Sequence, residues 1–151
     1  MKKRKKILLI LGVLLIVAAS VGLYIYKEYN RTHKDTADIK PDHSVIATDL
    51  IKDFETDEQG SNKKYWDKVL EIDGTVKDIT RDERGFYSVT LGDTASMSSV
   101  RCSMDSIHNN EVAALQKGNA ATMKGICTGF NADELLGSDV ILVRCVVVLK
   151  K

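Results

Sequence analysis

Residues 70–77 read LEIDGTVK, and apolar residues alternate with polar ones along the whole stretch. Leu70, Ile72 and Val76 fall on one side of an extended chain, together with Gly74. A period of two is typical of a strand that buries one face against a core. This stretch therefore predicts the first strand of a β-rich domain.

The same alternation recurs at four places further along the chain. The expected strands are centred on residues 87–91, 100–104, 121–127 and 140–149. In the last of them, the period places Ile141, Val143, Cys145 and Val147 inward and Arg144 outward. Between the third and fourth strands, residues 105–116 predict a short helix that ends before Gly118, since glycine commonly follows a helix.

A helix is expected ahead of the first strand. Ala47, Leu50, Ile51 and Phe54 recur at helical spacing, which predicts one apolar stripe that faces the core. Asp42 or Ser44 is the expected capping residue. Residues 57–65 predict one or two further turns, interrupted by Gly60. Three strands, a short helix and two strands make the order of an OB-fold, a five-stranded Greek-key barrel.

In detail, the chain resembles the tRNA-anti-like OB-fold family of exported or membrane-anchored bacterial proteins with no assigned molecular function. The resemblance covers residues 45–149 and rests on residues 57–58, 64–65, 68–69, 71–76, 100–102, 117–119, 124–129 and 139–145. It implies a mainly β barrel behind an N-terminal helix. The sequence departs from the family pattern at Gly60, and at Asp67, where glycine is expected. Nucleic-acid binding follows from the family name by fold analogy only.

Residues 7–26 read ILLILGVLLIVAASVGLYIY and contain no charged side chain. As a helix they reach roughly 30 Å, which matches the hydrocarbon thickness of a bilayer. Five lysines and arginines in residues 2–6 precede the run, which predicts a cytoplasmic N-terminus and an extracytoplasmic C-terminal domain in the periplasm or at the cell surface. A cleaved signal peptide, with its cleavage site near Ala18–Ser20, is the competing interpretation.

The predicted organisation is therefore a basic tail at 1–6, a transmembrane helix or signal anchor at 7–26, a polar linker at 27–43 and an OB-fold domain at 44–151. From residue 27 onward the chain carries 17 basic and 21 acidic side chains, a net charge of −4. Such a balance disfavours strong nucleic-acid binding, which depends on neutralising phosphates.

No catalytic motif is present: GxSxG, HExxH and phosphate-binding glycine loops are missing from the sequence. We therefore expect a binding module of the bacterial envelope rather than an enzyme, without cofactor or metal. Phe86, Arg84, Arg101 and Lys124 are the candidate binding residues, near a loop at 131–137. The expected partners are membrane lipid along residues 7–26 and an envelope protein, small peptide or glycan. Single-stranded nucleic acid is the alternative ligand.

Three cysteines make one disulfide conceivable in an exported domain. In an antiparallel hairpin the numbers of facing residues have a constant sum, and a turn centred near Leu136 sets Cys127 opposite Cys145. The sequence therefore predicts either a Cys127–Cys145 bridge or two small buried thiols. Cys102, on a neighbouring strand, is a competing partner for Cys145.

Overall fold

The computed structural model describes residues 12, 15, 17–26, 35–133 and 135–149. The chain divides into two compact units, residues 1–34 and 35–151. Residues 12, 15 and 17–26 are helical, but no helix within the described part of the chain is long and apolar enough to cross a membrane. The other residues of the predicted span at 7–26 lie outside the described residues.

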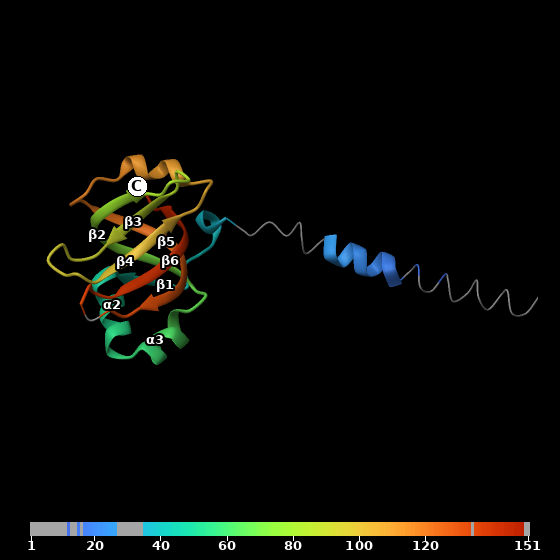
Figure 1. Cartoon of the computed structure of the whole chain (residues 1–151), viewed down its shortest axis with the longest axis horizontal. Coiled ribbons are helices and arrows are strands. Elements are labelled where there is room, and N and C mark those ends of the chain that lie inside the picture. Colours follow the sequence, from blue (N-terminus) through green and yellow to red (C-terminus); the bar gives the residue numbers. More distant parts are fainter. Residues whose placement is uncertain (1–11, 13–14, 16, 27–34, 134, 150–151) are drawn as a thin grey trace, which may run out of the picture. The chain divides into compact units, whose positions relative to one another are not determined.

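The second unit is a closed β-barrel (Figure 1). Its five strands are β2 (Val69–Arg81), β3 (Tyr87–Leu91), β4 (Ser99–Met104), β5 (Ala120–Asn131) and β6 (Asp139–Val147). They pair in the order β2-β3-β4-β6-β5, and β5 pairs with the first half of β2 to close the barrel. Only β4 and β6 run parallel among these pairs. The predicted five strands and their barrel are confirmed.

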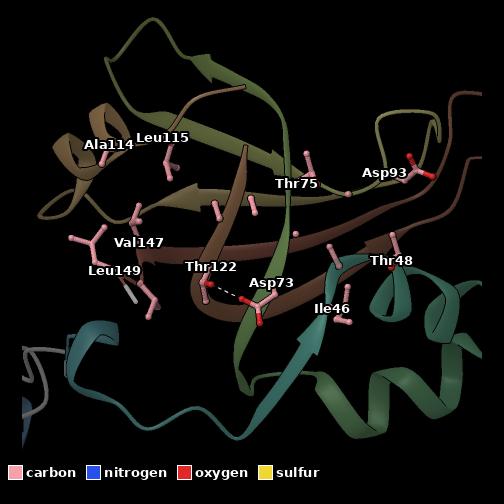
Figure 2. A pocket seen from close by; sticks show the side chains of 16 residues that line it. Ile46, Thr48, Asp73, Thr75, Asp93, Ala114, Leu115, Thr122, Val147 and Leu149 are labelled. Carbon is pink, nitrogen blue, oxygen red and sulfur yellow. Dashed lines mark hydrogen bonds between the residues drawn. The ribbon is translucent and has the colours of Figure 1, made fainter. Parts of the chain in front are cut away.

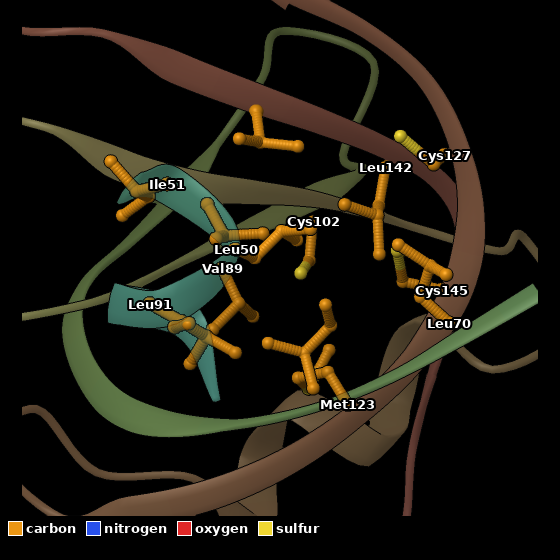
Figure 3. Packing of buried hydrophobic residues seen from close by; sticks show 14 of the residues in the cluster. Leu50, Ile51, Leu70, Val89, Leu91, Cys102, Met123, Cys127, Leu142 and Cys145 are labelled. Carbon is orange, nitrogen blue, oxygen red and sulfur yellow. The ribbon is translucent and has the colours of Figure 1, made fainter. Parts of the chain in front are cut away.

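Helices precede the barrel and interrupt it once. In α2 (Ala47–Thr56) all four residues of the predicted stripe are buried, as expected. Between β4 and β5 the predicted short helix is a 3-10 helix, η2 (Asn109–Ala114). Figure 3 shows the core, in which Leu50 and Ile51 of α2 belong to the same buried cluster as residues from the strands. α2 therefore contributes directly to the barrel core.

The predicted cap of α2 is wrong, because residues 43–46 are extended. They form β1 (His43–Ile46), which pairs in parallel with residues 70–73 of β2. Ile46 occupies the N-cap position and provides no side-chain hydrogen bond. The Asp42 carboxylate instead accepts a hydrogen bond from the backbone N–H of Val69 at 2.9 Å, so it holds β1 to β2 rather than capping the helix.

The backbone of α3 (Glu58–Tyr65) and of the turn that follows it accommodates both departures from the family pattern. The Asp57 carboxylate caps this helix by accepting from the backbone N–H of Gly60 at 2.9 Å. A β-carbon at Gly60 would collide with that carboxylate, so glycine fits the cap. Asp67, just before β2, has a φ of 57°, a left-handed conformation that glycine adopts more readily. The chain therefore keeps the backbone turn that glycine would favour.

The predicted inward face of β6 is wrong over its first half. Val140 and Leu142 are fully buried, whereas Ile141 and Val143 are only half-buried. Arg144 has a φ of 52°, and the register between β4 and β6 shifts beside it. This irregularity reverses the alternation, so Cys145 points inward as predicted although residues 141 and 143 do not.

The three cysteines are buried free thiols, and the geometric basis of the predicted bridge is wrong. Two register shifts interrupt the β5–β6 hairpin, so that Cys127 faces Leu142 instead of Cys145. The side chain of Cys145 lies against Gly125. Burial raises the pKa of Cys127 to about 11 and that of Cys145 well above its ordinary value, which keeps both thiols protonated.

The barrel unit begins earlier than the sequence suggests. Residues 35–42, which we call the strap, include the 3-10 helix η1 (Thr36–Asp38) and belong to the barrel unit, with Thr36 fully buried. The predicted linker at 27–43 therefore overlaps the folded domain. The sequence pattern did not indicate this packing, because the strap is held mainly by hydrogen bonds and ion pairs rather than by an apolar stripe.

Candidate functional site

The outer face of β3 and β4 carries short hydroxyl side chains around one cation. Ser88 faces Ser103, and Thr90 faces Arg101 across the two strands. The Arg101 guanidinium donates to Asp139 at 2.7 Å, and about half of its side chain is exposed. Because a carboxylate already offsets its charge, Arg101 is a weaker phosphate ligand than the sequence suggested.

Phe86 and Arg84 lie together in the turn between β2 and β3. The Asp82 carboxylate accepts from the backbone N–H groups of both residues, at 2.9 Å from Arg84 and 2.8 Å from Phe86. Phe86 is 43% exposed. At the base of the turn, the Arg81 guanidinium lies 5.3 Å from the centre of the Tyr87 ring. The turn thus presents one exposed ring and neighbouring cations on a fixed backbone.

Lys124 is not available to a ligand, which corrects the prediction. Its side chain is buried, and its ammonium donates to the carbonyl oxygens of Ala37 at 2.7 Å and Ile39 at 3.0 Å. Both acceptors belong to the strap. Burying an ammonium is tolerated only when its hydrogen bonds are satisfied, and here the strap satisfies two of them. Lys124 therefore attaches the strap to β5.

A groove of about 880 Å³ lies elsewhere on the barrel (Figure 2). It is lined by residues 46–48, 73–75, 92–93, 114–115, 120–122 and 147–149. Most of these side chains are small or aliphatic. Ligand sites commonly have this volume and an apolar lining with a few polar groups, so the groove is a candidate binding site.

The polar groups of the groove are carboxylates and hydroxyls. Asp73 on β2 accepts a short hydrogen bond from the Thr122 hydroxyl on β5, and Asp93 lies further along (Figure 2). Among the lining residues that the structure describes, none is lysine, arginine or aromatic. Ile46 and Leu149, which also line the groove, are 53% and 75% exposed. The groove thus suits an uncharged, partly apolar ligand and disfavours phosphates.

Sequence reasoning missed this groove because six separate segments form it. Alternation along one strand identifies which side chains face inward, but not where neighbouring segments leave a space between them. The exposed apolar residues Ile46 and Leu149 were the available signal, since each continues an apolar pattern without being needed in the core.

His108 joins the strap to the loop after β4. Its Nε2 lies 2.8 Å from a carboxylate oxygen of Asp35, and its Nδ1 lies 2.6 Å from one of Glu111. Carboxylates only accept, so both ring nitrogens donate when His108 carries a positive charge. Hydrogen bonding to Asp35 is the main reason why the pKa of His108 is raised, and Glu111 adds to it. Asp105 and Arg144, which interact at 3.4 Å, lie in the same region.

We expect the strap to loosen as pH rises. A raised folded-state pKa means that the stabilisation is fully present below about pH 6.5 and is lost as pH passes through the folded-state value. Amide exchange in residues 35–42 should therefore accelerate at alkaline pH beyond its intrinsic rise. In His108→Gln this extra dependence should disappear, whereas His43→Gln should keep it. If amide exchange in His108→Gln kept the same extra dependence on pH, His108 would not be the group that holds the strap.

Comparison with known proteins gives a fold relative and a family. No curated protein matches the chain significantly. A structure from Klebsiella pneumoniae subsp. pneumoniae MGH 78578, called a "putative nucleic acid-binding lipoprotein", is 19% identical with a TM-score of 0.55. The match covers 79% of this chain and 100% of that one, and at this identity it supports the fold alone. The tRNA_anti-like family matches residues 1–147, so the resemblance is confirmed and the chain belongs to the tRNA_anti-like family.

Proposed function

We propose that the protein is a membrane-tethered, non-catalytic binding module whose barrel lies outside the cytoplasm. Its groove takes an extended, uncharged segment of another envelope protein. The observation that carries this proposal is the groove itself, about 880 Å³ of space lined by aliphatic and small polar side chains without a cation among its described residues. Such a lining favours a peptide segment over a phosphorylated ligand.

The position of β1 supports a peptide ligand. In the sheet order β1 is the terminal strand and pairs only with β2 among the described strands. Its last residue, Ile46, lines the groove. An extended peptide can add to such an edge through backbone hydrogen bonds while its side chains enter neighbouring space. The groove and the edge therefore suit the same kind of ligand.

The tether is proposed from the sequence. Twenty uncharged residues at 7–26 suffice to span a bilayer, and the five basic residues before them favour an N-terminus that stays in the cytoplasm. A barrel that follows such a segment would meet envelope proteins rather than cytoplasmic ones. Protease added to cells with a permeabilised outer envelope should digest the barrel, and protection of the barrel would contradict this placement.

A bulky side chain placed in the groove should prevent binding of the partner protein. Ala120 begins β5, is exposed and lines the groove, so Ala120→Trp adds a large ring at a position where a strand tolerates aromatic residues. We expect this variant to recover at least about tenfold less partner from crosslinked membranes, since steric exclusion removes the contact. Ser88→Trp, on the outer face of β3, is the matched control. Equal recovery of the partner with both variants would rule out the groove as its binding site.

Nucleic-acid binding is the second candidate. It is favoured by the name of the Klebsiella protein and by the exposed ring and cations around Phe86. This function requires salt-sensitive affinity for single-stranded oligonucleotides. Fluorescence anisotropy would measure it, with Phe86→Ala/Arg101→Ala as the variant. We expect no binding at micromolar concentrations; tight binding that the double substitution abolishes would make this function the correct one.

A further inference from the structure

A second, smaller pocket lies between the helices and the loop that joins β5 to β6. Its volume is about 370 Å³. Residues from α2, α3, the segment before β4, the end of β5 and the β5–β6 loop line it, and it shares no lining residue with the groove. It is therefore a separate site on the same domain.

Two stacked phenylalanines form one wall of this pocket. The rings of Phe54 and Phe130 lie 5.1 Å apart between centroids, with 20° between their planes. Phe54 is 1% exposed, whereas Phe130 is only partly buried and also lines the pocket. A partly exposed aromatic face attracts a cation through its quadrupole.

Three carboxylates surround the aromatic wall. Glu55, Glu58 and Asp133 line the pocket, and none of its described lining residues is lysine or arginine. The backbone N–H groups of Leu136 and then Leu135 lower the pKa of Asp133, which keeps it ionised. Glu58 has no side-chain partner within the described part of the chain. The pocket therefore concentrates negative charge without an internal cation.

Ser138 adds a hydroxyl group to the wall of the pocket. The residue is 8% exposed and lines the pocket. Its backbone N–H donates to Ser98 at 3.0 Å and its carbonyl accepts from Ser99 at 2.8 Å. Its hydroxyl, in contrast, has no hydrogen-bond partner among residues 35–133 and 135–149. The hydroxyl oxygen is not among the buried polar atoms that lack a partner, so it is open to the pocket, where it can accept a hydrogen bond from a ligand.

Large apolar side chains stand next to the pocket. Met97, Leu135 and Leu136 are 63%, 84% and 72% exposed. Met97 lies against Gly137, which lines the pocket and has a φ of 85°. The pocket therefore has an apolar border, which is typical of a surface that contacts another protein.

We propose that this pocket binds a lysine or arginine side chain of the partner protein, with apolar residues beside it in the partner sequence. This rests on the proposed function, since it specifies the chemistry of an envelope protein that the module binds. The cation lies against the face of Phe130, pairs with Glu55, Glu58 and Asp133, and donates to the Ser138 hydroxyl. The flanking apolar residues contact Met97, Leu135 and Leu136.

The test is a titration of the full-length protein in detergent with two peptides. Each peptide has one central residue flanked by leucines. This central residue is lysine in the first peptide and acetyl-lysine in the second. We expect the lysine peptide to bind at least about fivefold more tightly, because acetylation removes the charge. Equal affinity, or no binding of the lysine peptide, would overturn the proposal.

Variants locate the binding. Glu58→Gln keeps the shape of the side chain and should weaken the lysine peptide by about fivefold, whereas Glu83→Gln, in the exposed β2–β3 turn, should not. Ala120→Trp should leave this affinity unchanged, so that failure of the groove and failure of the pocket are distinguishable. An unchanged affinity of Glu58→Gln for the lysine peptide would overturn the proposal. Binding of the protein to phosphatidylglycerol vesicles, if Leu135→Ser/Leu136→Ser abolished it, would also overturn the proposal.

Discussion

Leu50→Ala is expected to lower the free energy of unfolding by about 3 kcal/mol, within the range of roughly 2–5 kcal/mol for such truncations. Leu50 is fully buried and lies in the same cluster as Val89, Leu91 and Cys102 of the barrel (Figure 3). Removing its branched end takes away buried apolar contacts and leaves a cavity that rigid strands fill poorly. Urea denaturation followed by circular dichroism measures the change.

The control for Leu50 lies on the same helix. Lys52 is exposed, so Lys52→Ala should change stability by no more than about 0.5 kcal/mol. An effect of Leu50→Ala as small as that of the control would mean that α2 is not part of the barrel core. The packing of α2 against the strands would then have to be reconsidered.

Lys124→Met is expected to destabilise the domain by about 1–3 kcal/mol and to release the strap. The apolar side chain fills much of the same space but leaves the carbonyl oxygens of Ala37 and Ile39 without their donor. Urea denaturation gives the stability, and amide exchange in residues 35–42 reports on the strap.

Lys117→Met is the matched control for Lys124. Lys117 is 70% exposed and makes only a 3.4 Å pair with Asp78, which should contribute no more than about 1 kcal/mol. If Lys124→Met were as stable as Lys117→Met, with unchanged amide exchange in residues 35–42, Lys124 would not hold the strap. The structure predicts that Lys124→Met is the less stable of the two variants, since only Lys124 donates to the strap carbonyls.

The period of two and the helical stripe were sufficient to predict the barrel strands and α2. Alternation identified Leu70, Ile72 and Val76 as inward because a half-buried strand imposes that pattern directly. The same rule failed in β6, where Arg144 adopts a left-handed backbone conformation and reverses the phase. A bulge leaves no clear mark in the sequence, since arginine is not a residue that signals positive φ.

The candidate sites were less predictable than the fold. Phe86 and Arg84 lie in the expected turn, but Arg101 already pairs with Asp139 and Lys124 is buried beneath the strap. Both outcomes depend on residues distant in the sequence. The groove and the second pocket could not be predicted for the same reason, because each forms only where several segments distant in the sequence come together.

Site-specific photocrosslinking in living cells tests the proposed binding most directly. A photoreactive residue at Thr75 lies in the groove (Figure 2), and one at Ser88 lies on the outer face of β3. We expect a discrete protein adduct from position 75, formed in the envelope and absent from position 88. An adduct from position 88 alone, or crosslinks to nucleic acid, would contradict the account.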